Sequence, residues 1–178
     1  MDKTVIKKIL PIIATALTFV PIYSAFAAPI VREVMQSSAS GSSGSLQPIK
    51  VWNGHGVSIS FYKTKETIKR VWIDDPSQIL LDSDGCLDGI DDDCDENGAG
   101  LIHLRRIKRL DIKGMPKTHT TQLTIITESA QGRKSYHFRV IPASGTPEYS
   151  QIAIVPDSSF RRNPRRRPAP SLGTYSQY

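Results

Sequence analysis

The sequence predicts an all-β protein, folded as a single antiparallel β-sandwich or barrel-like domain. Two observations carry this prediction: short runs of residues alternate between apolar and polar side chains, and residues that favour turns separate the runs. The run at 57–62, for example, places Val57, Ile59 and Phe61 on one face of a strand. No segment of the sequence has the long 3.6-residue apolar spacing of an amphipathic helix.

Eight runs fit the strand pattern, and they are rich in β-branched and aromatic side chains. They are the segments 49–52, 57–62, 67–73, 77–81, 101–107, 122–127, 135–140 and 150–156. Gly, Pro, Asn, Asp and Ser fill the intervals, and the intervals at 53–56 and 130–134 are predicted hairpin turns. Many short strands at this spacing indicate two packed sheets or a barrel.

Residues 1–27 are predicted to be a secretory signal peptide. Lysines precede an apolar run from Ile9 to Val20, and Ala25 and Ala27 give the small-residue pattern of a cleavage site. The alternative is a retained membrane anchor, but the run is shorter than the about 20 residues of a bilayer span. We therefore expect cleavage after Ala27 and an exported protein in the periplasm or the extracellular space.

Three further parts follow the signal peptide. Residues 28–48 are rich in Ser and Gly and are predicted to be a disordered linker. Residues 49–156 form the β-domain, and residues 157–178 form a disordered tail rich in Arg and Pro. Arginine forks bind phosphate and carboxylate, so the tail is a candidate contact for a protein partner or an anionic envelope surface, with a purely solubilising tail as the alternative. The arginines concerned are Arg161, Arg162, Arg165, Arg166 and Arg167.

Charge is unevenly distributed along the chain. The formal net charge is +6, and the segment 82–97 contains eight acids and no Lys or Arg, which leaves +14 for the rest. A basic body favours acidic partners. We expect no specific nucleic-acid recognition, because the protein is exported and no aromatic residues interleave with the tail arginines.

The acidic loop, residues 82–98, is a candidate calcium site because clustered carboxylates suit this hard cation. Its spacing departs from the EF-hand loop: counted from Asp82, glycine takes the fourth place and Asp93 the twelfth. The alternative is a solvated hairpin insertion without metal, and no other cofactor is indicated. The candidate ligands are Asp82, Asp84, Asp88, Asp91, Asp93 and Asp95.

The chain has two cysteines, Cys86 and Cys94, and both lie in the acidic loop. Two cysteines that flank a turn-rich run in an exported chain are expected to pair. Seven residues separate them, which does not fit a C-x-x-C redox motif, and zinc would need further Cys or His ligands. We predict a disulfide that closes a small loop, worth about 2–3 kcal/mol in the chain-entropy account.

The sequence contains no catalytic motif that we can identify. His103 and His137 alternate with apolar residues and are predicted to be sheet-surface side chains, while His55 lies in a turn and His119 in a polar loop. The carboxylates of the acidic loop are neighbours in sequence and do not form the paired environments that acid–base catalysis needs. We therefore expect a non-enzymatic protein.

Three stretches of the domain together resemble the N-terminal β-domain of secretin-like periplasmic proteins, closest in layout to the TraK/TrbG-type proteins of conjugative type IV secretion systems. They are Gly54–Phe61, Ile68–Pro76 and Thr121–Val140. The resemblance implies a scaffold or assembly subunit whose partners are other protein subunits of an envelope complex. The alternative from another class is a secreted calcium-dependent binding or adhesion module that uses the acidic loop.

Overall fold

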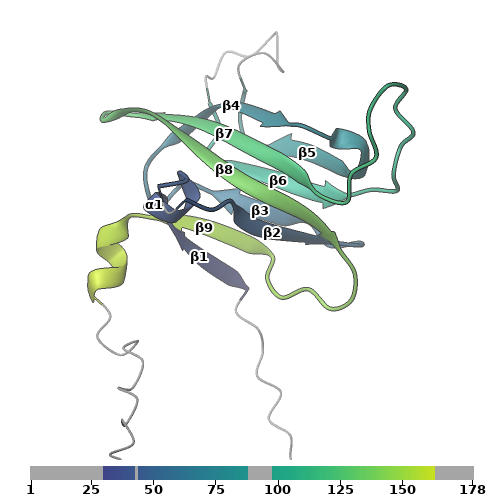
Figure 1. Cartoon of the computed structure of the whole chain (residues 1–178). Coiled ribbons are helices and arrows are strands. Elements are labelled where there is room, and N and C mark those ends of the chain that lie inside the picture. Colours follow the sequence, from purple (N-terminus) through teal and green to yellow (C-terminus); the bar gives the residue numbers. More distant parts are fainter. Residues whose placement is uncertain (1–29, 43, 88–97, 163–178) are drawn as a thin grey trace, which may run out of the picture.

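In a computed structural model, the described residues are 30–42, 44–87 and 98–162. They form strands, one short α-helix and two 3-10 helices (Figure 1). In chain order the elements are β1 Val31–Met35, α1 Gln36–Ala39, β2 Gln47–Trp52, β3 Val57–Ser60, β4 Thr67–Ile73, η1 Pro76–Gln78, β5 Ile79–Ser83, β6 Leu101–Arg106, β7 Thr121–Ser129, β8 Gly132–Ala143, β9 Gln151–Val155 and η2 Asp157–Arg162.

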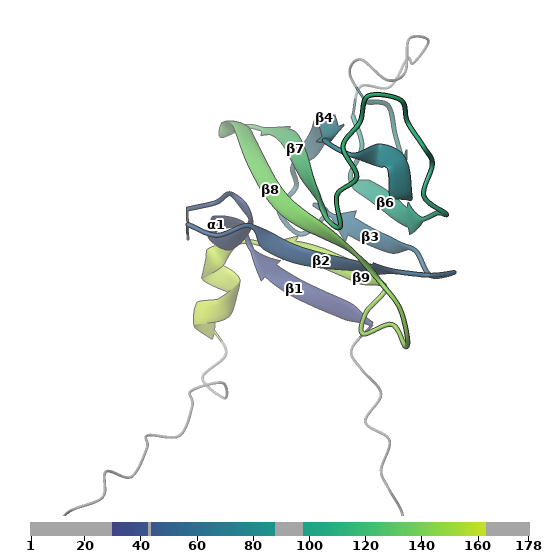
Figure 2. The same cartoon turned by 45° about the vertical axis from the view of Figure 1, so that its right-hand side comes forward.

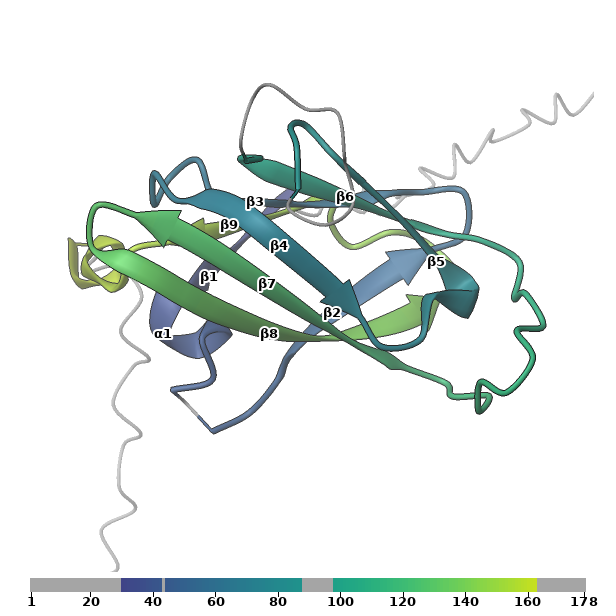
Figure 3. The same ribbon diagram turned by 90° about the horizontal axis from the view of Figure 1, so that it is seen from above.

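The strands form two sheets that pack against each other. One has five strands in the order β1-β9-β3-β6-β5, and the other has four in the order β2-β8-β7-β4. Figure 3 shows the strands of the four-stranded sheet crossing in front of those of the five-stranded sheet. The predicted all-β, two-sheet fold is confirmed, and each of the eight predicted runs overlaps a strand.

The sheets are mixed, which differs from the antiparallel arrangement that the sequence predicts. Among the described residues, three of the seven strand pairings are parallel: β1 with β9, β2 with β8, and β3 with β9. Parallel partners come from distant parts of the chain and need a crossover connection instead of a tight turn. Two-residue alternation reports which residues form strands but carries no information about their direction.

The predicted linker at 28–48 differs from what the structure has. Residues 31–35 form the edge strand β1, and α1 follows directly. Val34 is buried, and Ser37 donates hydrogen bonds from its amide and its hydroxyl to the Asp157 carboxylate at 3.2 and 2.9 Å. β9 and the start of η2 therefore hold residues 31–39 in place, and β2 begins at Gln47.

The core lies between the sheets and follows the predicted alternation. Phe61 and Tyr136 meet edge to face with ring centroids 4.9 Å apart, and Trp52 meets Tyr149 in the same manner at 5.0 Å. Such aromatic pairs add to the free energy gained by burying their area. The other large, fully buried side chains are Phe138, Ile49, Ile59, Ile68, Leu87, Ile102, Leu104, Leu123 and Ile125.

One of the two predicted hairpin turns is a hairpin. The residues at 130–131 join β7 to β8, and Gly132 takes the positive φ of 99° that this short turn needs. The turn at 53–56 instead joins β2 to β3, which belong to different sheets. This corner turn carries the chain from one sheet to the other, so the two strands that it connects do not pair with each other.

The two ends of the sandwich differ. α1 and η2 lie together at one end, and the long connection between β6 and β7, residues 107–120, extends from the other end (Figures 1 and 2). Within the described ranges, no helix has the length and apolar character needed to cross a membrane.

Candidate functional site

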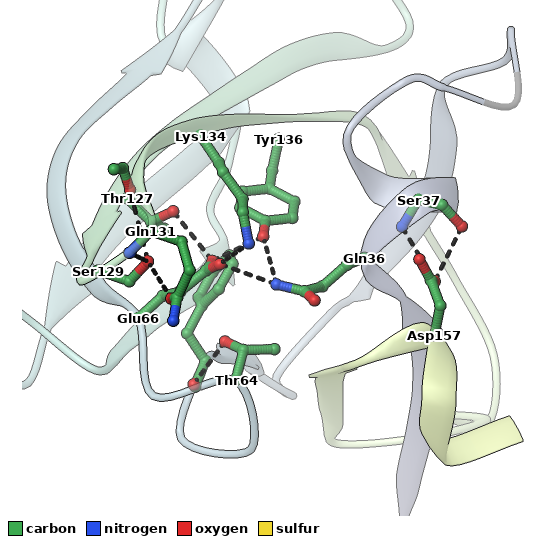
Figure 4. Close-up of polar contacts among 12 residues, drawn as sticks. Gln36, Ser37, Thr64, Glu66, Thr127, Ser129, Gln131, Lys134, Tyr136 and Asp157 are labelled. Atoms are coloured by element: carbon green, nitrogen blue, oxygen red, sulfur yellow. Dashed lines mark hydrogen bonds and ion pairs between the residues drawn. The ribbon is translucent and has the colours of Figure 1, made fainter.

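A buried carboxylate, Glu66, lies inside the sandwich just before β4 and collects four donors (Figure 4). Oε2 accepts hydrogen bonds from the Tyr136 hydroxyl at 2.6 Å and from the Thr127 hydroxyl at 3.0 Å. Oε1 accepts from the Gln36 amide at 2.8 Å and from the Lys134 ammonium at 2.6 Å. Four donors offset the desolvation of one carboxylate, so its function is to hold the fold together.

The environment of Glu66 fixes the protonation of its partner Tyr136. Burial raises the pKa of the Tyr136 hydroxyl far above its ordinary value, and the hydrogen bond to Glu66 raises it further. The hydroxyl therefore stays protonated and remains a donor. Because Gln36 belongs to α1 and its amide also donates to the Tyr136 oxygen at 3.1 Å, this cluster attaches the N-terminal segment to the four-stranded sheet.

Asp84, one of the candidate calcium ligands, closes the base of the acidic loop. Its Oδ1 accepts hydrogen bonds from the backbone amides of Gly100 at 2.9 Å and Leu101 at 2.8 Å. Its Oδ2 accepts from the hydroxyl of Tyr62, and this hydrogen bond raises the pKa of Tyr62. Both carboxylate oxygens are thus engaged in holding the two ends of the loop together.

Of the remaining candidate calcium ligands, the structure describes only Asp82. Asp82 is exposed on β5, and its carboxylate accepts a hydrogen bond from the Ser83 amide at 2.9 Å. Four candidates lie outside the described residues: Asp88, Asp91, Asp93 and Asp95. Within the described ranges, no group of three or more His, Cys, Asp or Glu side chains could hold a metal ion.

The predicted disulfide lies only half within the described residues. Cys94 is outside them, while Cys86 is inside and forms a backbone bridge with Gly98. A second bridge joins Ile68 to Ala99, with mutual amide–carbonyl hydrogen bonds of 2.6 and 3.0 Å. No free cysteine occurs in the part of the chain that the structure describes. The pairing of Cys86 with Cys94 stays a prediction.

The arginine tail is likewise divided. The backbone of Arg161 and Arg162 ends η2, and Arg165, Arg166 and Arg167 lie outside the described residues. Asp157, in the first turn of η2, accepts the two hydrogen bonds from α1. The position at which the chain enters the tail is therefore fixed against the N-terminal segment.

The four histidines have the surface positions that the sequence predicts. His103 on β6 shares a hydrogen bond of 2.9 Å with the Ser58 hydroxyl of the neighbouring strand. His137 on β8 contacts the Thr124 hydroxyl of β7 at 3.3 Å. His55 is exposed in the corner turn, and His119 is exposed in the β6–β7 loop.

A second buried carboxylate, Asp75, supports the β6–β7 loop, residues 107–120. Asp75 caps η1 by accepting a hydrogen bond from the Ser77 amide at 2.9 Å. Its other oxygen accepts from the Thr118 hydroxyl at 2.8 Å and lies 3.8 Å from the Arg109 guanidinium. Hydrogen bonding from Ser77 holds the pKa of Asp75 below its ordinary value even though burial opposes this.

Backbone contacts complete the support of this loop. The amide of Ile107 donates to the Gln78 carbonyl at 2.9 Å, and the amide of Leu110 donates to the Ser77 carbonyl at 2.8 Å. The guanidinium of Arg109 also donates to the Thr118 carbonyl, which joins the two arms of the loop. The β6–β7 loop is therefore held in one shape by η1 and Asp75.

Two hollows flank the β6–β7 loop. One, of about 370 Å³, is lined by cationic and polar side chains that include Arg106, Arg109, Lys117 and His119. The other, of about 520 Å³, has a more apolar lining that includes Ile112, Met115 and Pro116 together with Asp74. This loop is not among the sites predicted from the sequence, although six Lys and Arg between positions 105 and 119 are a visible signal.

The described residues define a class of protein: a mixed two-sheet β-sandwich in which both buried carboxylates have structural roles and the charged hollows lie at the surface. No protein-family model matches this chain, and a search of the curated proteins finds no relative.

Proposed function

We propose that this protein is an exported, non-enzymatic scaffold or assembly subunit of an envelope secretion or conjugation complex, of the type IV secretion kind. The signal peptide is cleaved after Ala27, and the mature protein resides in the periplasm or the extracellular space. Its partners are other protein subunits of the complex. The acidic loop is closed by a disulfide between Cys86 and Cys94.

One observation carries the proposal. The buried carboxylates Glu66 and Asp75 each join segments that are distant in sequence, and their oxygens accept hydrogen bonds from structural partners. Such groups stabilise a fold and are poorly placed to exchange protons with a substrate. Exposed apolar side chains occur on edge strands, such as Trp72 on β4 and Leu80 on β5, and on the β6–β7 loop, where they suit contact with another macromolecule.

The three stretches that carry the family resemblance occupy coherent positions. Gly54–Phe61 contains the corner turn and β3, Ile68–Pro76 contains most of β4 and the start of η1, and Thr121–Val140 contains the β7–β8 hairpin. They contribute the three adjacent strands β8, β7 and β4 to the four-stranded sheet and the central strand β3 to the five-stranded sheet. This supports a common architecture with those scaffold proteins.

Crosslinking in the native envelope tests the proposal. The tagged protein is crosslinked at low salt, purified, and analysed for co-purifying subunits. We expect defined partners for the wild type and reduced recovery when the five tail arginines are replaced by Gln. Exposed ionic contacts are screened over about 8 Å at physiological salt, so recovery should fall as salt rises.

Two results would contradict the scaffold role. One is a protein that runs as a monomer and co-purifies with nothing at low salt. The other is a thermal stabilisation by calcium that disappears on chelation, which would support the calcium-dependent binding or adhesion module instead.

A further inference from the structure

The β6–β7 loop combines positive charge with accessible apolar side chains. The loop, residues 107–120, contains four Lys and Arg and one acid, Asp111, and Arg105 and Arg106 end β6 directly before it. Asp111 is exposed and pairs with the exposed Lys117 at 3.4 Å, so it neutralises little of this charge in water. Arg109 lies 3.8 Å from the buried Asp75, so the exposed cations of the loop are Lys108, Lys113 and Lys117.

Two aliphatic side chains of this loop face solvent. Leu110 is 55% exposed and Ile112 is 37% exposed, and they flank Asp111. Both line a small cleft together with Arg109 and Lys117, which also line the cationic hollow. Apolar and cationic groups are thus neighbours on one continuous surface.

The loop is shaped in advance for contact. Gly114 has a positive φ of 84° and makes the turn at which the Met115 amide donates to the Ile112 carbonyl at 3.1 Å. The hydrogen bonds that the loop donates to the carbonyls of η1 and to the carboxylate of Asp75 hold its two arms. Little conformational entropy is therefore lost when a ligand binds to this surface.

We propose that the β6–β7 loop docks on an anionic phospholipid surface. The exposed Lys108, Lys113 and Lys117 face lipid phosphates, and Leu110 and Ile112 enter the boundary between headgroups and acyl chains. Each lysine near an anionic membrane raises the affinity about five-fold, and burial of the apolar side chains raises it further. This surface does not depend on the scaffold function proposed above.

Two features favour lipid over an acidic protein as the ligand. A lipid interface presents phosphate above hydrocarbon, which matches cations beside exposed aliphatic side chains. The contact area of one loop is also small for a stable protein interface, whereas a membrane offers many headgroups to one cluster of cations. η2 lies at the opposite end of the sandwich from the β6–β7 loop (Figures 1 and 2).

Vesicle co-sedimentation tests this proposal with the exported protein and its intact tail. The vesicles are phosphatidylcholine alone, or equal parts of phosphatidylcholine and phosphatidylglycerol. The charge variant combines Lys108→Gln, Lys113→Gln and Lys117→Gln, and we expect it to weaken binding to the anionic vesicles by about ten- to a hundred-fold. The apolar variant, Leu110→Ser with Ile112→Ser, should weaken binding to the same vesicles even at salt concentrations that screen the lysines.

A matched control removes equal charge elsewhere: Lys63→Gln, Lys65→Gln and Arg133→Gln, all exposed and outside the loop. A second control replaces the five tail arginines with Gln. In both control backgrounds, adding Leu110→Ser with Ile112→Ser should still weaken binding to the anionic vesicles. If the loop variants bind the anionic vesicles as well as the wild type does, or if tail replacement alone abolishes all binding, the proposal is wrong.

Fluorescence gives a direct reading of insertion. In a Trp72→Phe background, Leu110→Trp places an indole at the proposed contact, and Trp52 remains buried. We expect a blue shift of the emission with phosphatidylglycerol vesicles and none with free inorganic phosphate. A shift with phosphate alone, or no shift with either, would contradict lipid insertion. Loss of an envelope crosslink in the lysine variant without any vesicle binding would identify an acidic protein as the ligand instead.

Discussion

The hydroxyl of Tyr136 donates a hydrogen bond of 2.6 Å to the carboxylate of Glu66, which lies 70 positions earlier in the chain. Both side chains are buried between the sheets. The same carboxylate receives the amide of Gln36 from α1, so one buried anion connects three separate parts of the fold. Removing a single donor should therefore be costly.

We predict that Tyr136→Phe destabilises the protein by about 1.5–3 kcal/mol, because a hydrogen bond to a buried charged group is lost while the ring still packs. Denaturant unfolding measures the change. Tyr62→Phe is the matched control, since its hydroxyl also donates to a carboxylate but its side chain is exposed. Equal losses for the two variants would show that burial of Glu66 does not strengthen its contacts.

Asp75 should make stability depend on pH in the acid range. Its pKa is lower in the folded protein than the ordinary value of 3.8, so the stabilisation that it provides is complete above that value and is lost as the pH falls through the folded pKa. We expect Asp75→Asn to destabilise the protein at neutral pH, and we expect the gap from wild type to narrow below about pH 4.

Urea unfolding of both proteins across this pH range checks the prediction. The neighbouring Asp74 is exposed, so Asp74→Asn serves as the control and should change stability little at any pH. A constant difference between wild type and Asp75→Asn at neutral and acid pH would mean that the ionised form of Asp75 does not carry the stabilisation.

Eight of the nine strands in the described residues were predictable because each has a local signal. Alternation at 57–60 and at 135–140 fixes which side chains face the core, and the buried positions follow it closely. β1 has a weaker pattern and borders a Ser/Gly-rich segment, so its strand state depends on parallel pairing with β9, more than 100 residues later. No property of the residues at 31–35 alone encodes that partner.

The clusters around Glu66 and Asp75 were not predictable for a related reason. A single acidic residue near a strand is predicted to lie on the surface. Its burial becomes favourable only when hydrogen-bond donors from other parts of the fold surround it, and the sequence does not show these donors. The β6–β7 loop has a signal in its density of Lys and Arg, but the sequence does not show that η1 and Asp75 hold these residues in one shaped loop. The sequence shows where charged residues lie along the chain, but only the folded structure shows which of them are neighbours on the surface.

We predict that the mature protein begins at Ala28. This start leaves β1 intact, because Val31 is its first residue. Intact-mass measurement of the exported form decides the matter. A mass that begins at Met1 would contradict cleavage, and a start beyond position 31 would remove part of a strand that the fold uses.

Two contacts within the described residues close the base of the acidic loop. The Asp84 carboxylate accepts hydrogen bonds from two amides on the returning arm, and a backbone bridge pairs Cys86 with Gly98. A further bridge, between Ile68 and Ala99, attaches the returning arm to β4. The two arms of the loop are therefore brought together independently of any covalent bond. A Cys86–Cys94 disulfide would then add its stabilisation mainly by restricting the unfolded chain, which for a loop of this length is about 2–3 kcal/mol.

Cys86→Ser should therefore lower the free energy of unfolding by about that amount and leave the fold intact, since the core lies in the sheets. Reductant should destabilise the wild type to a similar degree and leave Cys86→Ser unchanged, which separates loss of the bond from loss of the side chain. Alkylation of the unreduced, denatured protein should label neither cysteine. A labelled thiol in the purified exported protein would show that the loop is held by its backbone and by Asp84 alone.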